Sequence, residues 1–134
     1  MALAARVIRS GEASEQLSGI ALKTFFRIAG LWRLSPVEQR ALLGSIPEST
    51  FYKWAKAPDT ARLQRDQLDR VSHILGIYKS INILLPRHES ADSWIKRPNE
   101  AALFKGHSAL AYMLSGGLER IVDVRRYLDG KRGW

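Results

Sequence analysis

Residues 35–57 carry the sequence SPVEQRALLGSIPESTFYKWAKA, and this stretch decides the fold class. Ser35 is a typical N-cap, Pro36 suits the first position of a helix, and Glu38 is placed to close a capping box. Gly44 supplies the flexible backbone of a helix stop only a few residues later. The first half of the stretch therefore predicts one short helix with defined ends.

The second half predicts another helix. Ser45-Ile46-Pro47-Glu48 repeats the S-x-x-E capping pattern, and the helix is expected to run to about Ala57, before Pro58. Two short helices joined by a tight turn at residues 44–46 have the spacing of a helix-turn-helix. The alternative is two ordinary short helices that pack a core, since this geometry also occurs in all-α proteins with no DNA role.

If residues 35–57 are a helix-turn-helix, the second helix enters the major groove with its N-terminus first. Hydroxyl groups and a lysine ammonium suit phosphates or base edges, while Phe51 and Trp54 are expected to face the core. Glu48 counts against DNA binding, because phosphate repels a carboxylate that has no cytosine amino group to accept from. The predicted DNA-facing residues are Ser49, Thr50, Tyr52 and Lys53, with Arg40 and Lys56 as phosphate contacts.

Helical spacing of apolar residues continues on both sides of this stretch. A preceding helix is expected to end at Gly30, a long core helix to run from Asp66 to Pro86, and short helices to lie around Trp94 and after Ser108. Gly116-Gly117 makes a turn before the final helix. No stretch alternates with period two, so the predicted class is all-α. The predicted apolar faces are Leu17, Ile20, Ala21, Phe25, Ile28 and Ala29; Leu68, Val71, Leu75, Tyr78 and Asn82; and Leu118, Ile121, Val122 and Leu128.

Composition limits the function classes. The 134 residues include 46% hydrophobic and 25% charged residues, as in ordinary folded domains, and the absence of cysteine excludes disulfides and thiolate zinc sites. The longest uncharged stretch, 106–118, is too short to span a bilayer, and residues 1–10 lack a secretory signal, so a cytoplasmic protein is expected. The net charge of +8, spread evenly over both halves, favours an anionic partner: nucleic acid, an acidic protein or a membrane surface.

No pattern points to catalysis. The histidines at 73, 88 and 107 are too far apart for a metal pair on one helix, and His73 is expected to be a partly buried structural residue. Glu119 and Asp123 lie four residues apart near several arginines, which is typical of a solvated, salt-bridged face. No nucleophile has a partnered base. We therefore expect no enzyme activity, no cofactor and no metal.

The C-terminus, Arg125-Arg126-Tyr127-Leu128-Asp129-Gly130-Lys131-Arg132-Gly133-Trp134, ends in an aromatic residue that bears the chain's carboxylate. One interpretation is a frayed basic tail, the usual state of a chain end. The other is a docking plug, since Trp and Arg are common anchors of protein interfaces.

A dimer is also predicted. Helix-turn-helix proteins commonly pair to span two half-sites. In addition, four aromatic residues are more than a small helical half would be expected to bury alone: Trp32, Phe51, Trp54 and Tyr78.

Four separated motifs together resemble the Xre/MbcA/ParS antitoxins of bacterial type II toxin–antitoxin pairs, whose toxins carry a RES domain. The motifs occur in order over most of residues 31–134. They are Ser49-Thr50-Phe51-Tyr52-Lys53-Trp54; Arg65-Asp66-Gln67-Leu68 through Leu75-Gly76-Ile77-Tyr78-Lys79; Trp94-Ile95-Lys96-Arg97-Pro98-Asn99 with Phe104-Lys105-Gly106; and Gly116-Gly117 followed by Val124-Arg125-Arg126-Tyr127-Leu128-Asp129.

The resemblance implies an all-helical protein with an Xre-like helix-turn-helix domain at 15–64 and a toxin-binding domain at 65–134, which share the long central helix. Residues 1–14 are expected to form an arm. It further implies an antitoxin that binds an NAD⁺-degrading RES toxin, occludes its active site with the C-terminal end, and represses its own operon by binding operator DNA. The alternative is a free-standing repressor whose C-terminal half only dimerises it.

The expected toxin-binding residues follow from the plug interpretation. Asp129 and the terminal carboxylate of Trp134 would replace substrate phosphates, and the Trp134 indole would fill an apolar slot of the toxin. A second expected surface lies around Trp94 and Asn99. The full set is Trp94, Asn99, Arg126, Asp129, Lys131, Arg132, Gly133 and Trp134.

Overall fold

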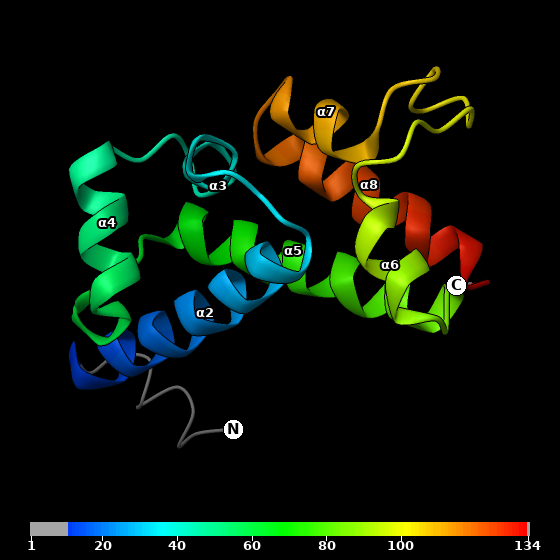
Figure 1. The fold of residues 1–134 in the computed structure, drawn as a ribbon. Helices are drawn as coiled ribbons and strands as arrows, with labels where there is room; N and C mark the ends of the chain where they lie inside the picture. Colours follow the sequence, from blue (N-terminus) through cyan, green and yellow to red (C-terminus); the bar gives the residue numbers. More distant parts are fainter. Residues whose placement is uncertain (1–10, 134) are drawn as a thin grey trace.

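The computed structural model describes residues 11–133, with side chains from residue 16 onward. Within these residues it contains helices and no strand, apart from one isolated bridge between Pro98 and Ser108, so the predicted all-α class is confirmed. Of the predicted arm at 1–14, residues 1–10 lie outside the described residues. In chain order (Figure 1) the elements are α2 (Gly11–Leu31), α3 (Pro36–Leu42), α4 (Glu48–Lys56), the 3-10 helix η1 (Pro58–Thr60), α5 (Arg65–Leu84), α6 (His88–Trp94), α7 (Ala109–Leu114) and α8 (Leu118–Lys131).

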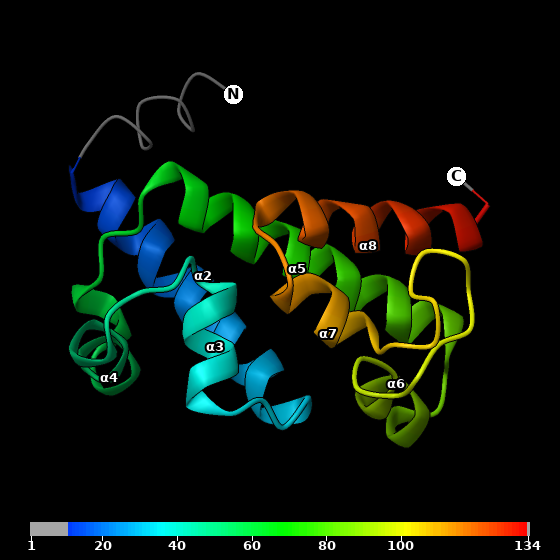
Figure 2. The same ribbon diagram turned by 90° about the horizontal axis from the view of Figure 1, so that it is seen from above.

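Helix α5 is the shared central element that the sequence predicts. It packs against α2 on the N-terminal side and along α8 on the C-terminal side, and α8 runs beside it in the same direction (Figure 2). Because two neighbours cover α5, its apolar surface is wider than one stripe. The fully buried α5 residues are Val71, Ile74, Ile77, Ser80 and Ile81, whereas the predicted members Leu68, Leu75 and Tyr78 lie at the edge of the core.

The capping box of α3 is confirmed. The Glu38 amide donates to Ser35 Oγ at 3.1 Å, and the Ser35 amide donates to Glu38 Oε1 at 2.8 Å. Pro36 occupies the first turn, and Gly44 follows the helix with φ of 98°. A left-handed backbone costs glycine little, so the predicted stop is correct. The predicted cap at Ser108 is also present, since its Oγ accepts from the Ala111 amide at 3.0 Å.

The second predicted capping box is wrong. Ser45 has a left-handed φ of 59°, and its amide donates to the Arg40 carbonyl at 2.8 Å. An N-cap needs extended backbone, so a residue in this turn conformation does not cap the next helix. Helix α4 begins at Glu48 after Pro47, with no side-chain cap.

The predicted helix stop at Gly30 is also misplaced. Helix α2 continues to Leu31, and Arg33 adopts the left-handed conformation with φ of 55°. The Leu34 amide donates to the Ala29 carbonyl at 2.9 Å and the Arg33 amide to the Gly30 carbonyl at 3.2 Å, which is a Schellman motif. Leu34 is buried beneath this turn, and its packing offsets the cost of a left-handed arginine.

Burial overturns the stated reason for a dimer. Trp32, Phe51 and Trp54 are only 1%, 4% and 9% exposed within a single chain, and Tyr78 is half-buried against Trp32. The predicted inner face of α2 is partly wrong as well, because Leu17 is 44% exposed and Ile20 is 64% exposed. The predicted members Phe25, Ile28 and Ala29 are buried, and Ser18 and Leu22 also lie on the buried face of α2.

Up to residue 133, the C-terminal end is regular helix followed by a turn and not a frayed tail. Helix α8 continues to Lys131, and the Arg132 amide donates to the carbonyls of Leu128 and Asp129. Gly133 then takes a left-handed φ of 86°, and its amide donates to the Gly130 carbonyl at 3.1 Å. Trp134, the proposed anchor of the plug, lies outside the described residues.

Candidate functional site

Helix α4 presents one polar face at an end of the molecule, on the left in Figure 1. Ser49, Tyr52, Lys53 and Lys56 are exposed and follow one another at the spacing of a single helical face. Thr50 is half-buried. Four of the predicted DNA-facing side chains therefore share one accessible surface.

The opposite side of α4 anchors the helix to the body. Phe51 and Trp54 are buried, as the sequence predicts, and the Phe51 ring meets the edge of Phe26 at a centroid distance of 5.9 Å. Arg40 is half-buried, and its Nε donates to the Ile46 carbonyl at 3.0 Å. Arg40 thus stabilises the turn between α3 and α4. Its Nε is used in this bond, so the predicted phosphate contact would have to be made by its other N–H groups.

The charge on this face is basic toward the C-terminal end of α4. Lys53 and Lys56 lie in its last turn, and neither is in an ion pair with a carboxylate in the part of the chain whose side chains are described. Glu48 lies in the first turn, where the helix dipole favours a negative charge. Stabilisation of the helix therefore explains the presence of Glu48, the residue that counted against DNA binding.

A second surface lies at the other end of the molecule, where α5, α6 and α8 end (Figure 1). It contains an apolar notch of about 200 Å³, which we name the Trp94 notch. The notch brings Trp94 beside Lys131 of the predicted plug, and Lys131 Nζ lies 5.5 Å from the centroid of the Tyr127 ring. Its lining residues are Ile81, Leu84, Leu85, Trp94, Tyr127, Leu128 and Lys131.

Asn99, the other residue predicted on this surface, holds a loop in shape. Its Oδ1 accepts from the Ala101 amide at 2.9 Å, its amide donates to the His107 carbonyl and its carbonyl accepts from the Gly106 amide. These bonds close the loop 99–107 on itself. Asn99 therefore fixes the shape of the loop. The Oδ1 atom of its side-chain amide is already hydrogen-bonded within the loop.

Asp129 and Arg132 are tied to the seam between α8 and α5. Ser80 Oγ, fully buried, donates to Asp129 Oδ1 at 3.4 Å and accepts from Arg132 Nη1 at 3.1 Å. Arg125 Nε lies 4.0 Å from the other Asp129 oxygen. Arg126, by contrast, is exposed. The last turn of α8 is thus fixed in place while Arg126, Lys131 and Gly133 remain accessible.

The same seam contains His73. Burial, followed by the nearby Arg125 guanidinium, lowers the pKa of His73, and Arg125 Nη1 lies 3.3 Å from His73 Nδ1. His73 is half-buried, as predicted. In the described part of the chain, no cluster of side chains is suited to a metal ion, and no helix is long and apolar enough to cross a membrane.

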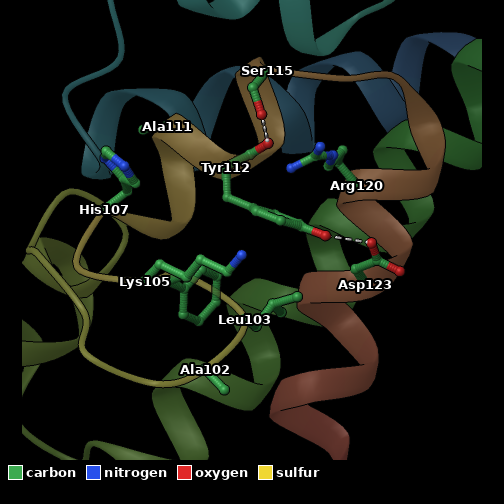
Figure 3. Close-up of a pocket in the computed structure, with 10 residues that line it drawn as sticks. Ala102, Leu103, Lys105, His107, Ala111, Tyr112, Ser115, Arg120 and Asp123 are labelled. Atoms are coloured by element: carbon green, nitrogen blue, oxygen red, sulfur yellow. Dashed lines mark hydrogen bonds between the residues drawn. The ribbon is translucent and has the colours of Figure 1, made fainter.

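A hollow of about 750 Å³, which no local sequence pattern indicates, lies between the loop 99–107, α7 and α8 (Figure 3). We name it the Tyr112 hollow. The Tyr112 hydroxyl donates to Asp123 Oδ2 at 2.6 Å, which raises the pKa of Tyr112, and the Arg120 guanidinium lies 4.3 Å from the centroid of the Tyr112 ring. Lys105 and His107 contribute from the loop.

The prediction that Glu119 and Asp123 pair with the arginines of α8 is wrong. Asp123 accepts from Tyr112 on α7, and Glu119 turns back to accept from the Gly117 amide at 3.0 Å. That backbone bond lowers the pKa of Glu119. Both carboxylates accept their hydrogen bonds from groups other than the arginines of α8.

Arg70 of α5 ties α3 to the central helix. The Arg70 side chain is 13% exposed, its Nε lies 2.8 Å from Asp66 Oδ2, and its Nη1 donates to the Leu42 carbonyl at the end of α3 at 3.5 Å. Lys96 adds a second link, since its Nζ donates to the Arg33 carbonyl at 2.5 Å. The Arg70 contact holds α3 against α5, and the Lys96 contact joins the segment after α6 to the turn after α2.

Comparison with known proteins assigns the two ends. A family model described as the antitoxin Xre-like helix-turn-helix domain matches residues 12–76, and the antitoxin Xre/MbcA/ParS C-terminal toxin-binding domain matches residues 82–133. The two models adjoin within α5, the helix that both halves share. The uncharacterized protein y4oB of Sinorhizobium fredii is 52% identical over 112 residues, which is 84% of each chain. No solved structure matches the chain.

The matched segments coincide with the two surfaces. The α4 face lies inside the helix-turn-helix match, and the Trp94 notch and α8 lie almost wholly inside the toxin-binding match. This architecture implies a toxin partner and DNA binding. The chain belongs to the Xre/MbcA/ParS antitoxin family, with an Xre-like helix-turn-helix domain joined to a toxin-binding domain through one central helix.

Proposed function

We propose that this antitoxin neutralises a RES-domain toxin that degrades NAD⁺, by placing the C-terminal end of α8 in the toxin's active site. The observation that carries the proposal is the fixed last turn of α8, held through Asp129 and Arg132 to the buried Ser80. An anchored helix end delivers the residues that follow it without an ordering cost, and such preorganisation favours tight binding.

The chemistry of the chain end suits a pocket built for a dinucleotide. The rings of a dinucleotide occupy apolar slots of such a site, and the Trp134 indole fills one of these slots. Arg126 and Lys131 then face acidic residues at the rim. Asp129, half-buried against α5, contributes by holding the helix end rather than by entering the pocket.

The second part of the proposal is repression of the antitoxin's own operon through α4. Ser49 and Tyr52 lie toward base edges, and Lys53 and Lys56 toward phosphates, on the exposed side of α4. The α4 face and the Trp94 notch lie at opposite ends of the molecule. DNA and toxin therefore bind at the same time, and the toxin complex acts as the repressor.

We also propose a homodimer, on different residues from those that the sequence suggested. Leu17 and Ile20 lie one helical turn apart on α2 and are both exposed, and a second copy of α2 would cover them. Ile20→Glu would then convert a dimer to a monomer in sedimentation at micromolar concentration. A wild-type chain that sediments as a monomer, with DNA or toxin present, contradicts this part.

Growth and cellular NAD⁺ under co-expression with the RES-type reading frame beside the antitoxin gene test the main proposal. Wild type should restore both. The alternative, a free-standing repressor whose C-terminal half only dimerises it, predicts promoter binding with no protection from the toxin. A neighbouring frame without a RES domain would favour that alternative.

A further inference from the structure

The Tyr112 hollow has a volume of about 750 Å³, and neither the α4 face nor the proposed plug uses it. Its floor includes the Tyr112 ring, which meets the edge of Phe104 at a centroid distance of 5.8 Å. Figure 3 shows Lys105 from the loop and Arg120 from α8 extending toward Tyr112. Two cations from separate elements thus share one hollow.

The carboxylates near Arg120 are already occupied. Glu119 accepts from the Gly117 amide, and Asp123 accepts from the Tyr112 hydroxyl. Of the ion pairs formed by the described side chains, none involves Lys105 or Arg120. The half-buried Arg120 guanidinium stacks on the Tyr112 ring and forms no ion pair with a described carboxylate, so its N–H groups can donate to an acceptor from another molecule.

The backbone at Lys105 adds a second, independent observation. Lys105 has a left-handed φ of 51°, a conformation that is unfavourable for a residue with a Cβ and that glycine adopts freely. The closed loop 99–107 enforces it, because the Lys105 amide donates to the Ala101 carbonyl at 3.0 Å. Strained residues of this kind cluster at ligand clamps. Lys105 is also one of the residues that line the hollow.

We propose that the Tyr112 hollow receives an Asp or Glu side chain of the toxin, held between Lys105 and Arg120 beside the Tyr112 ring. This inference rests on the proposed toxin partnership. The hollow lies in the segment that matches the toxin-binding domain, and it lies away from α4 (Figure 1), which favours the toxin over DNA as the source of the acid. The contact is separate from the C-terminal plug and would fix the toxin's orientation.

Lys105→Gly separates binding from folding. Glycine removes the ammonium and also relieves the left-handed strain, so the melting temperature should stay level or rise. Toxin affinity, measured by calorimetry with the neighbouring toxin made catalytically inactive, should fall about tenfold or more, as for a charged interface partner. Lys105→Arg should bind nearly as wild type does.

Arg33→Gly is the matched control. Arg33 is also an exposed cation with left-handed φ, at 55°, but it does not line the hollow. Its glycine variant should bind the toxin as wild type does. Equal loss in both variants would indicate a general charge effect and overturn the site, as would unchanged binding by Lys105→Gly.

Two further outcomes separate this inference from the proposed function. If wild type binds and inhibits the toxin while Lys105→Gly matches it, only the site is refuted. If wild type does not bind the toxin at all, the proposed function and the site fail together. Loss of promoter binding in Lys105→Gly, with toxin binding intact, would assign the hollow to phosphate and refute the inference.

Discussion

Removing both lysines from the last turn of α4 should weaken operator binding in a way that depends on salt. Lys53 and Lys56 are exposed and form no ion pair with any described side chain, so the double variant Lys53→Ala/Lys56→Ala should fold normally. Each phosphate contact contributes about 0.9 to the slope of log K against log salt, so the slope should become shallower by about 1.8. Between roughly 50 and 200 mM salt, wild type should lose about twelvefold more affinity than the variant.

Fluorescence anisotropy on the protein's own promoter at the two salt concentrations measures this difference. The matched control is Lys79→Ala/Arg126→Ala, which removes the same charge from exposed positions in the C-terminal half. Its salt slope should equal that of wild type. An unchanged slope in the α4 variant, or an equal change in the control, would show that DNA does not contact this face.

Two further predictions concern stability. Ser35→Ala removes the oxygen that accepts from the Glu38 amide and should lower the free energy of unfolding by about 1 kcal/mol in urea titrations, a result that an unchanged midpoint would contradict. Because burial and Arg125 lower the pKa of His73, stability from its neutral form is present above its usual pKa of about 6.5 and is lost as the pH falls through the lowered value. His73→Gln should therefore show a flatter loss of stability between about pH 7 and pH 5 than wild type, and parallel profiles would remove His73 as the cause.

The sequence predicts most of the helices because their signals are local. Ser35 and Ser108 cap helices through bonds to amides three residues away, and such patterns are visible without the fold. Ser45 carries the same pattern but is held in a left-handed turn by the Arg40 carbonyl. The backbone conformation, and not the residue pattern, decides whether a serine caps a helix.

Burial and the Tyr112 hollow are predicted less well because they depend on contacts between elements. Periodicity marks Leu17 and Ile20 as one apolar face but does not show whether another helix covers it. Asp123 looked like part of a charged helix surface, yet its partner is a tyrosine on the preceding helix. The face of α4 was predictable, because Phe51 and Trp54 mark the side that must be buried.

The most direct test of the account is NAD⁺ consumption by the purified toxin in the presence of a chain that lacks only Gly133 and Trp134. This truncation retains the described helix α8 and the bond between Arg132 and Ser80, so the fold should be preserved. Wild type and Lys53→Ala/Lys56→Ala should inhibit the toxin at the same stoichiometry, whereas the truncated chain should leave it active. Full inhibition by the truncated chain would contradict the plug and place neutralisation on another surface, such as the Trp94 notch.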